Sequence, residues 1–163
     1  MSAKAAEPVD LSMLLNQAGY ALAAKMAERL ADVGISPREY CVLSKARGGD
    51  LTQNRVAELA ALDRTTMVVT VDALERAGLA ERRPSPTDRR ARIVALTDAG
   101  RRVADRADEI VAGLNDEVLG ELSARQRQAL VSGLASLVEG ALATPSHMER
   151  RPRRRNAPGS VRT

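Results

Sequence analysis

Apolar residues recur at helical spacing along most of the chain. Between residues 9 and 33, one apolar stripe contains leucines, Met26 and Val33, and a second stripe, containing Tyr20, lies on nearly the opposite side. A helix that is apolar on two faces must be covered on both of them. We therefore expect the core of the chain to cover one face and a second subunit to cover the other.

Capping residues mark five further helices. We expect these helices to begin just after Ser36, Thr52, Asp63, Thr97 and Ser123. The expected spans are residues 37–47, 53–61, 64–77, 98–122 and about 124–143. Because only a short turn separates the second and third of these helices, they must cross steeply, as in a helix-turn-helix.

After Gly78 the spacing of apolar residues changes from that of a helix to that of a strand. Residues 79–83 and 91–96 predict two short strands, and the proline-containing segment 84–90 between them predicts a loop. The expected fold class is therefore mainly α with a small two-stranded β wing. This is a winged helix-turn-helix with long helices at both ends.

The composition excludes several classes of function. The 163 residues include one cysteine, so no internal disulfide forms, and the single histidine, His147, rules out most histidine catalysis and zinc sites. No apolar run approaches the length of a membrane span, and the N-terminus shows no signal pattern. We expect a cytoplasmic protein that is not an enzyme, contacts no membrane and needs no cofactor or metal.

The net charge of +4 comes from the C-terminal tail. Residues 1–147 carry 19 Lys and Arg against 20 Asp and Glu, whereas residues 148–163 carry six Arg against one Glu. We expect residues 144–163 to form a disordered Arg-rich tail that either adds sequence-independent DNA affinity or only keeps the chain soluble. Within the body, five arginines lie between Ala80 and Arg92. Such a cluster indicates a phosphate partner or simply a solvated surface.

Four segments near the middle of the chain carry a family resemblance. They are LAALDRTT at 59–66, VDALERAGL at 71–79, RRPSPTDRRA at 82–91 and LTDAG at 96–100. Their most specific part is Asp88-x-Arg90 followed by Leu96-Thr97-x-x-Gly100. Together they resemble the MarR family of bacterial winged-helix transcription regulators, and the resemblance extends over roughly residues 9–143.

This resemblance implies a division of labour along the chain. Residues 9–33 and 97–143 would form a helical dimerisation region, and residues 34–96 the winged helix-turn-helix DNA-binding domain. A homodimer would place helix 64–77 in the major groove and its wing in a flanking minor groove of double-stranded DNA at a pseudo-palindromic operator. Such proteins usually repress genes, and a small anionic or aromatic ligand, or in some branches thiol oxidation, releases them.

The first candidate for DNA contact is Arg90, because the negative potential of a narrow minor groove attracts arginine. Asp88 would orient the wing. The other candidates are Arg64, Thr65, Thr66, Val68, Val69, Arg82, Arg83, Arg89, Thr52, Gln53 and Asn54. For Thr52, Gln53 and Asn54 a capping role is the alternative, and for the arginines a solvated surface is. Members of the family often carry Arg at 69 and Arg or Lys at 73. This chain has Val69 and Ala73 instead, so we expect its recognition of the operator to depend more on DNA shape.

Effector binding has three candidate residues. In the family, ligands lodge between the dimer helices and the winged domain, where Tyr20 and Tyr40 would stack and Arg38 would pair with an anion; plain packing is the alternative. Cys41 is either a thiol sensor or a small buried hydrophobic residue.

Two other classes of function stay open. The chain could be a winged-helix module that binds protein without specific DNA recognition, or a thiol-oxidation-sensing regulator that uses Cys41. An enzyme is disfavoured, because residues 1–146 contain no histidine and no phosphate-cradling glycine loop.

Arg90→Ala should weaken operator binding by about 1–3 kcal/mol, the contribution of one specific contact. Fluorescence anisotropy with a labelled operator measures the change in affinity. The mass of the dimer and the helical content of the protein should stay the same. An unchanged affinity would remove Arg90 from the interface.

Overall fold

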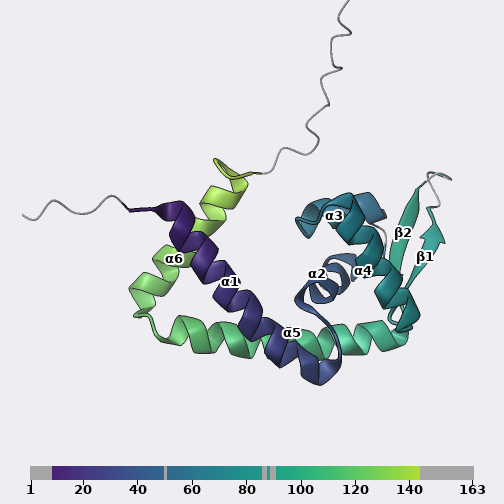
Figure 1. Cartoon of the computed structure of the whole chain (residues 1–163), viewed down its shortest axis with the longest axis horizontal. Helices are drawn as coiled ribbons and strands as arrows, with labels where there is room; N and C mark the ends of the chain where they lie inside the picture. The colour runs from purple at the N-terminus through teal and green to yellow at the C-terminus, as the bar shows by residue number, and fades with distance from the viewer. Residues whose placement is uncertain (1–8, 50, 86–87, 89–90, 144–163) are drawn as a thin grey trace, which may run out of the picture. The chain divides into compact units, whose positions relative to one another are not determined.

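A computed structural model of the chain describes residues 9–49, 51–85, 88 and 91–143 (Figure 1). Contacts within the chain divide it into two compact units, one that ends at Ser123 and one that begins at Ala124. In the described ranges, no helix is both long and apolar enough to cross a membrane. The expected Arg-rich tail, residues 144–163, lies outside the described residues.

Among the described residues, the first unit contains five α-helices and one β-hairpin, and the second contains one helix. In chain order the elements are α1 (Leu11–Leu30), the 3₁₀ helix η1 (Ala31–Val33), α2 (Pro37–Ala46), α3 (Gln53–Leu59), α4 (Arg64–Arg76), β1 (Ala80–Pro84), β2 (Arg92–Leu96), α5 (Asp98–Gly120) and, in the second unit, α6 (Ala124–Glu139). The predicted fold class, mainly α with a two-stranded wing, is confirmed. The functional division at residues 33/34 and 96/97 stays a prediction.

Side-chain caps begin four of the predicted helices as expected. Ser36, Thr52, Asp63 and Thr97 each accept a hydrogen bond from the backbone N–H three residues later. At Ser36 the box is reciprocal, because the carboxylate of Glu39 accepts the Ser36 N–H at 2.7 Å. These bonds satisfy backbone donors that a helix start otherwise leaves without partners.

The turn between α3 and α4 departs from the predicted boundaries. α3 ends at Leu59, not at residue 61, because Ala61 adopts a left-handed conformation with φ of 52°. The backbone N–H of Leu62 then donates to the carbonyl oxygen of Ala57 at 2.9 Å, which closes the helix end. Sequence alone gave no sign of this, since alanine rarely adopts positive φ.

One hydrophobic core joins every element of the first unit. Residues of α4 predicted to face inward, Met67, Val71 and Leu74, are at most 1% exposed, and Thr70 beside them is also buried. The core partners from the other elements include Leu30, Val42, Leu43, Val56, Val94, Leu96, Ala104 and Ala107. This packing places α4 against α2, α3 and β1, and it places α2 and β2 against α5.

The base of the hairpin is a tight junction with the start of α5. β1 and β2 pair antiparallel from Ala80 opposite Leu96 to Pro84 opposite Arg92. Thr97 donates its backbone N–H to the Leu79 carbonyl at 3.1 Å and its hydroxyl to the Gly78 carbonyl at 2.7 Å. A Cβ on Gly100 would lie only 1.8 Å from the Leu79 oxygen. Only glycine therefore lets α5 begin at this point.

Two helices leave apolar side chains uncovered. In α1 only Leu30 is buried, and in α6 no residue is buried. The most exposed large apolar residues of these helices are Leu11, Met13, Leu14 and Tyr20 in α1 and Leu130, Val131, Leu134 and Val138 in α6. The first apolar stripe of α1 reaches the core of its own chain only near its C-terminal end.

Gly100→Ala should destabilise the fold by about 1–3 kcal/mol, the usual cost of forcing an extra group into a packed site. Urea unfolding followed by circular dichroism measures the change. Gly113→Ala in the same helix is the control: no atom lies within 4 Å of its added Cβ, so higher helix propensity should stabilise it by up to about 1 kcal/mol. Equal effects of the two substitutions would contradict the close approach at Leu79.

Candidate nucleic-acid interface

The first turn of α4 is held by its cap. Asp63 accepts the backbone N–H of Thr66 at 3.0 Å and the Thr66 hydroxyl at 2.5 Å. These two hydrogen bonds hold the pKa of the Asp63 carboxyl below its ordinary value. Because the Thr66 hydroxyl is used in the cap, the side chains of this turn that stay exposed are those of Arg64 and Thr65.

The next turn of α4 exposes two valines. Val68 is 39% and Val69 60% exposed, although the helix buries its other apolar face completely. Apolar side chains on a solvent-facing surface can contact thymine methyl groups in a major groove. Asp72, one turn after Val68, lies on the same exposed side of the helix.

Arg82, which we expected to contact phosphate, is surrounded by partners within the chain. Its guanidinium forms ion pairs with Asp72 (2.7 Å) and Glu75, and its Nε donates to the side-chain oxygen of Gln53 at 2.9 Å. The side chain is only 22% exposed. The structure therefore gives both Arg82 and Gln53 a role in joining β1, α4 and α3.

The wing keeps one arginine largely exposed in its first strand. Arg83 is 60% exposed and pairs with Glu81 of the same strand. At the base of the loop, the Asp88 carbonyl accepts the backbone N–H of Ala91 at 3.0 Å, and the Asp88 N–H donates to Ser85 Oγ at 3.3 Å. The backbone of Asp88 thus closes the loop base. The loop candidates Arg89 and Arg90 lie outside the described residues.

The start of α3 contributes less surface than expected. The hydroxyl of Thr52 accepts the Arg55 N–H at 3.3 Å, and the backbone of Thr52 forms a bridge with Ile93 of β2. With Gln53 bound to Arg82, the remaining candidate at this end of α3 is Asn54, which is exposed.

The two tyrosines proposed for effector binding have different surroundings. Tyr20 is 80% exposed on α1, whereas Tyr40 of α2 packs against the core. Burial and a hydrogen bond to Asp108 of α5 raise the pKa of Tyr40 above its ordinary value. Arg38, near Tyr40 in sequence, is exposed.

A cluster that sequence reasoning missed connects α2 to α5. Arg47, just after α2, forms ion pairs with Asp105 and with Asp108, the latter at 2.5 Å. Asp108 is also the hydrogen-bond partner of Tyr40. Nothing local in the sequence signals this pairing, because the partners of Arg47 are 58 and 61 residues away.

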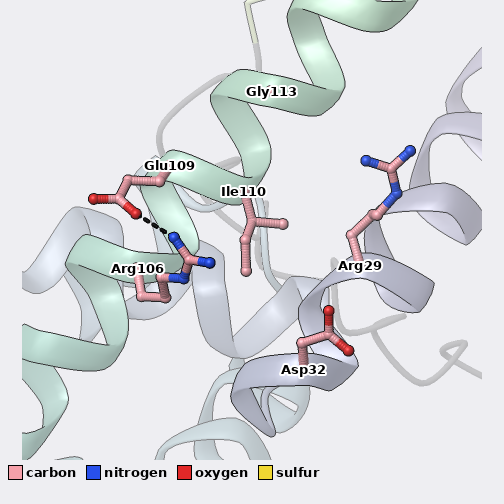
Figure 2. A pocket seen from close by; sticks show the side chains of 6 residues that line it. All are labelled: Arg29, Asp32, Arg106, Glu109, Ile110 and Gly113. Atoms are coloured by element: carbon pink, nitrogen blue, oxygen red, sulfur yellow. Dashed lines mark hydrogen bonds and ion pairs between the residues drawn. The ribbon is translucent and has the colours of Figure 1, made fainter.

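A cavity of about 280 Å³ lies between the end of α1 and α5 (Figure 2). It is lined by Arg29, Asp32, Arg106, Glu109, Ile110 and Gly113. Figure 2 shows Arg106 paired with Glu109 on α5, and Arg29 and Asp32 on the facing segment. None of the three expected effector residues lines this cavity.

Cys41 is in an environment that disfavours thiol chemistry. The side chain is partly buried, and this burial raises the pKa of the thiol, although Lys45 opposes the shift. A raised pKa leaves little thiolate at neutral pH, and the thiolate is the form that oxidants attack. The geometry thus favours the hydrophobic role over the sensing role.

Comparison with known proteins gives a consistent result. Residues 33–91 match the family model described as MarR family. A relative from Thauera aromatica, described as a putative transcriptional regulatory protein for the hcr operon, is 30% identical over 116 residues, which cover 71% of this chain and 70% of the relative.

Two solved structures of the protein CouR are similar to this chain. CouR from Rhodococcus jostii RHA1 bound to p-coumaroyl-CoA is 29% identical, with a TM-score of 0.71, over 86% of this chain and 96% of that one. CouR, a transcriptional repressor, bound to a 23-mer DNA duplex is 34% identical, with a TM-score of 0.70, over 78% of this chain and 92% of that one.

Cys41→Ser should leave DNA affinity unchanged, and peroxide should not release the wild-type chain from DNA, because burial raises the pKa of the thiol and oxidants attack the thiolate. A mobility-shift assay with and without peroxide measures both effects. Release that depends on peroxide in the wild type and is absent in the serine variant would establish the sensing role instead.

Proposed function

We propose, from the premise that this chain belongs to the MarR family of transcription regulators, that it is a homodimeric repressor of a pseudo-palindromic operator. The observation that carries the proposal is the two-sided character of α4. Met67, Val71 and Leu74 anchor the helix in the core, while Val68 and Val69 on its other side stay exposed. A helix held in this way can enter a major groove without disturbing the fold.

Contacts within each half-site follow from the position of each side chain. Arg64 and Thr65 at the start of α4 would bind phosphate or base edges, and Val68 and Val69 would contact thymine methyl groups. Arg83 on the wing and Asn54 at the start of α3 would bind phosphates, which position the protein without specifying a sequence. Arg89 and Arg90 keep the wing-tip role that their motif implies, with Asp88 as the residue that orients the loop. Because its proposed target is DNA, the protein would act in the cytoplasm.

The exposed apolar residues of α1 and α6 support the homodimer. Each helix, considered by itself, carries at least four large apolar side chains that the chain leaves uncovered. Apolar surface gathered in this way marks protein interaction sites. A second copy of the chain would cover it, and a two-fold dimer would present two α4 helices to half-sites about 10 base pairs apart.

The proposed effector is a small aromatic or anionic compound. CouR binds p-coumaroyl-CoA, which is both aromatic and anionic. In this chain the cavity beside α5 is lined by Arg29, Arg106 and apolar Ile110. Arg29 pairs with Glu117 and Arg106 with Glu109, so an anionic group would take the place of these acids. At about 280 Å³ it would hold a group the size of an aromatic acid, since pockets that bind whole drug-sized ligands measure about 300–1,000 Å³.

Selection of bound fragments from random duplexes tests the function. The recovered duplexes should share an inverted repeat, and light scattering should show two chains on each operator. Operator affinity should fall steeply as salt rises, because bound cations release counterions from DNA phosphates. Affinity that is weak, independent of sequence and unaffected by salt would favour the alternative of a winged-helix module that binds protein.

A further inference from the structure

The guanidinium of Arg82 lies where the wing, the recognition helix α4 and the start of α3 meet. In β1, Arg82 pairs with Val94, a fully packed position of β2. Its backbone N–H donates to one carboxylate oxygen of Glu75 at 2.7 Å, and its Nη1 pairs with the other. Main chain and side chain of one residue thus bind both oxygens of a single acid on α4.

Two further contacts extend this cluster. The Nε of Arg82 donates to the Gln53 side-chain oxygen at 2.9 Å, and Nη2 donates to the carbonyl oxygen of Val68 at 3.3 Å. The planar guanidinium has donors on each side, so it can hold several acceptors at fixed angles. Val68 is itself one of the exposed residues of α4, so the cluster reaches the helix at the turn proposed to read bases.

The ion pair with Asp72 has a different consequence. The Asp72 side chain is 50% exposed, on the side of α4 that carries Val68 and Val69. A carboxylate at this place faces the negative potential of a DNA groove, which disfavours binding unless a cation neutralises it. Arg82 supplies that cation at 2.7 Å.

We propose that Arg82 is a positioning residue for DNA reading: it fixes α4 to the wing through Glu75 and Gln53, and it neutralises Asp72 on the DNA-facing side of α4. This inference rests on the proposed function. It differs from a direct phosphate contact, because the donors of Arg82 are directed to acceptors within the chain. It also assigns a role to Asp72, an acidic residue whose place on a DNA-reading helix otherwise opposes binding.

The test compares binding of each variant to the selected operator and to an unrelated duplex, by fluorescence anisotropy over a range of salt. Arg82→Ala should lower operator affinity about tenfold or more, the scale of one lost specific contact, and should lower affinity for the unrelated duplex less. The ratio of the two affinities should therefore fall. Loss of a simple phosphate contact lowers both affinities alike and leaves the ratio unchanged.

Asp72→Asn separates the charge effect from the alignment effect. In the Arg82→Ala background it should raise affinity for both duplexes, because it removes an unpaired carboxylate. In the wild-type background it should change affinity much less, because Arg82 already neutralises that carboxylate. A double-mutant cycle measures this difference.

Two further variants serve as controls. Arg82→Lys keeps the positive charge but loses the planar set of donors, so it should lower the affinity ratio. Adding Asp72→Asn to this variant should raise DNA affinity only slightly. The lysine variant also keeps the test valid if the alanine variant unfolds. Arg83→Ala, on the adjacent and more exposed position, should leave the ratio unchanged.

The inference is overturned if the affinity ratio is the same in Arg82→Ala or Arg82→Lys as in the wild type, or if Asp72→Asn has equal effects in both backgrounds. If the wild-type chain binds no duplex at all, the proposed function fails and this inference fails with it. Operator binding by the wild type with an unchanged ratio in the variants defeats the inference alone.

Discussion

The close approach of α5 to the Leu79 carbonyl is the constraint on which the rest of the fold depends. At this point the end of α4, the two strands of the wing and the first turn of α5 are joined by the hydrogen bonds of Thr97 and by the missing side chain of Gly100. Both elements proposed to read DNA are thereby connected to the same long helix. The core behind them adds stability, and the close backbone approach at the junction leaves no room for a side chain between α5 and the Leu79 carbonyl.

Much of this architecture could be predicted because its signals are local. A capping box such as that of Ser36 and Glu39 requires only residues three positions apart, and the buried face of α4 follows from its spacing of apolar residues. The candidate site was harder to predict from the sequence, because its interactions join residues that are far apart in the chain. Gln53 and Arg82 are 29 residues apart, and nothing in the sequence shows that the Arg82 guanidinium is used within the chain. For the same reason the contact of Tyr40 with Asp108 could not be predicted from the sequence.

The placement of arginines resolves an apparent contradiction in the charge of the chain. Residues 1–147 are nearly neutral overall, and this net charge gives no reason to expect DNA affinity. The cations of this part of the chain nevertheless differ in whether acids of the same chain bind them. Several, including Arg47, Arg82 and Arg101, are bound to acids of their own chain, and their contribution is mainly structural. Arg64 at the start of α4 is exposed, and Arg83 of β1 is 60% exposed although it pairs with Glu81, so these two cations are the more accessible to a partner. Local geometry, more than net charge, therefore decides where a polyanion can bind.

Because α5 is long, a small rotation at one of its ends displaces the junction at its first turn by several ångströms. With 23 residues, the helix is about 35 Å long at 1.5 Å per residue. One end carries the wing, and near the other Glu117 pairs with Lys25 and Arg29 of α1. The first turn lies about 29 Å from Glu117 at 1.5 Å per residue, so a rotation of about 10° around Glu117 displaces it by about 5 Å. This displacement is about one and a half base-pair steps of B-form DNA. Under the proposed function, a rotation of this size at the far end of α5 would shift the wing relative to the groove it contacts.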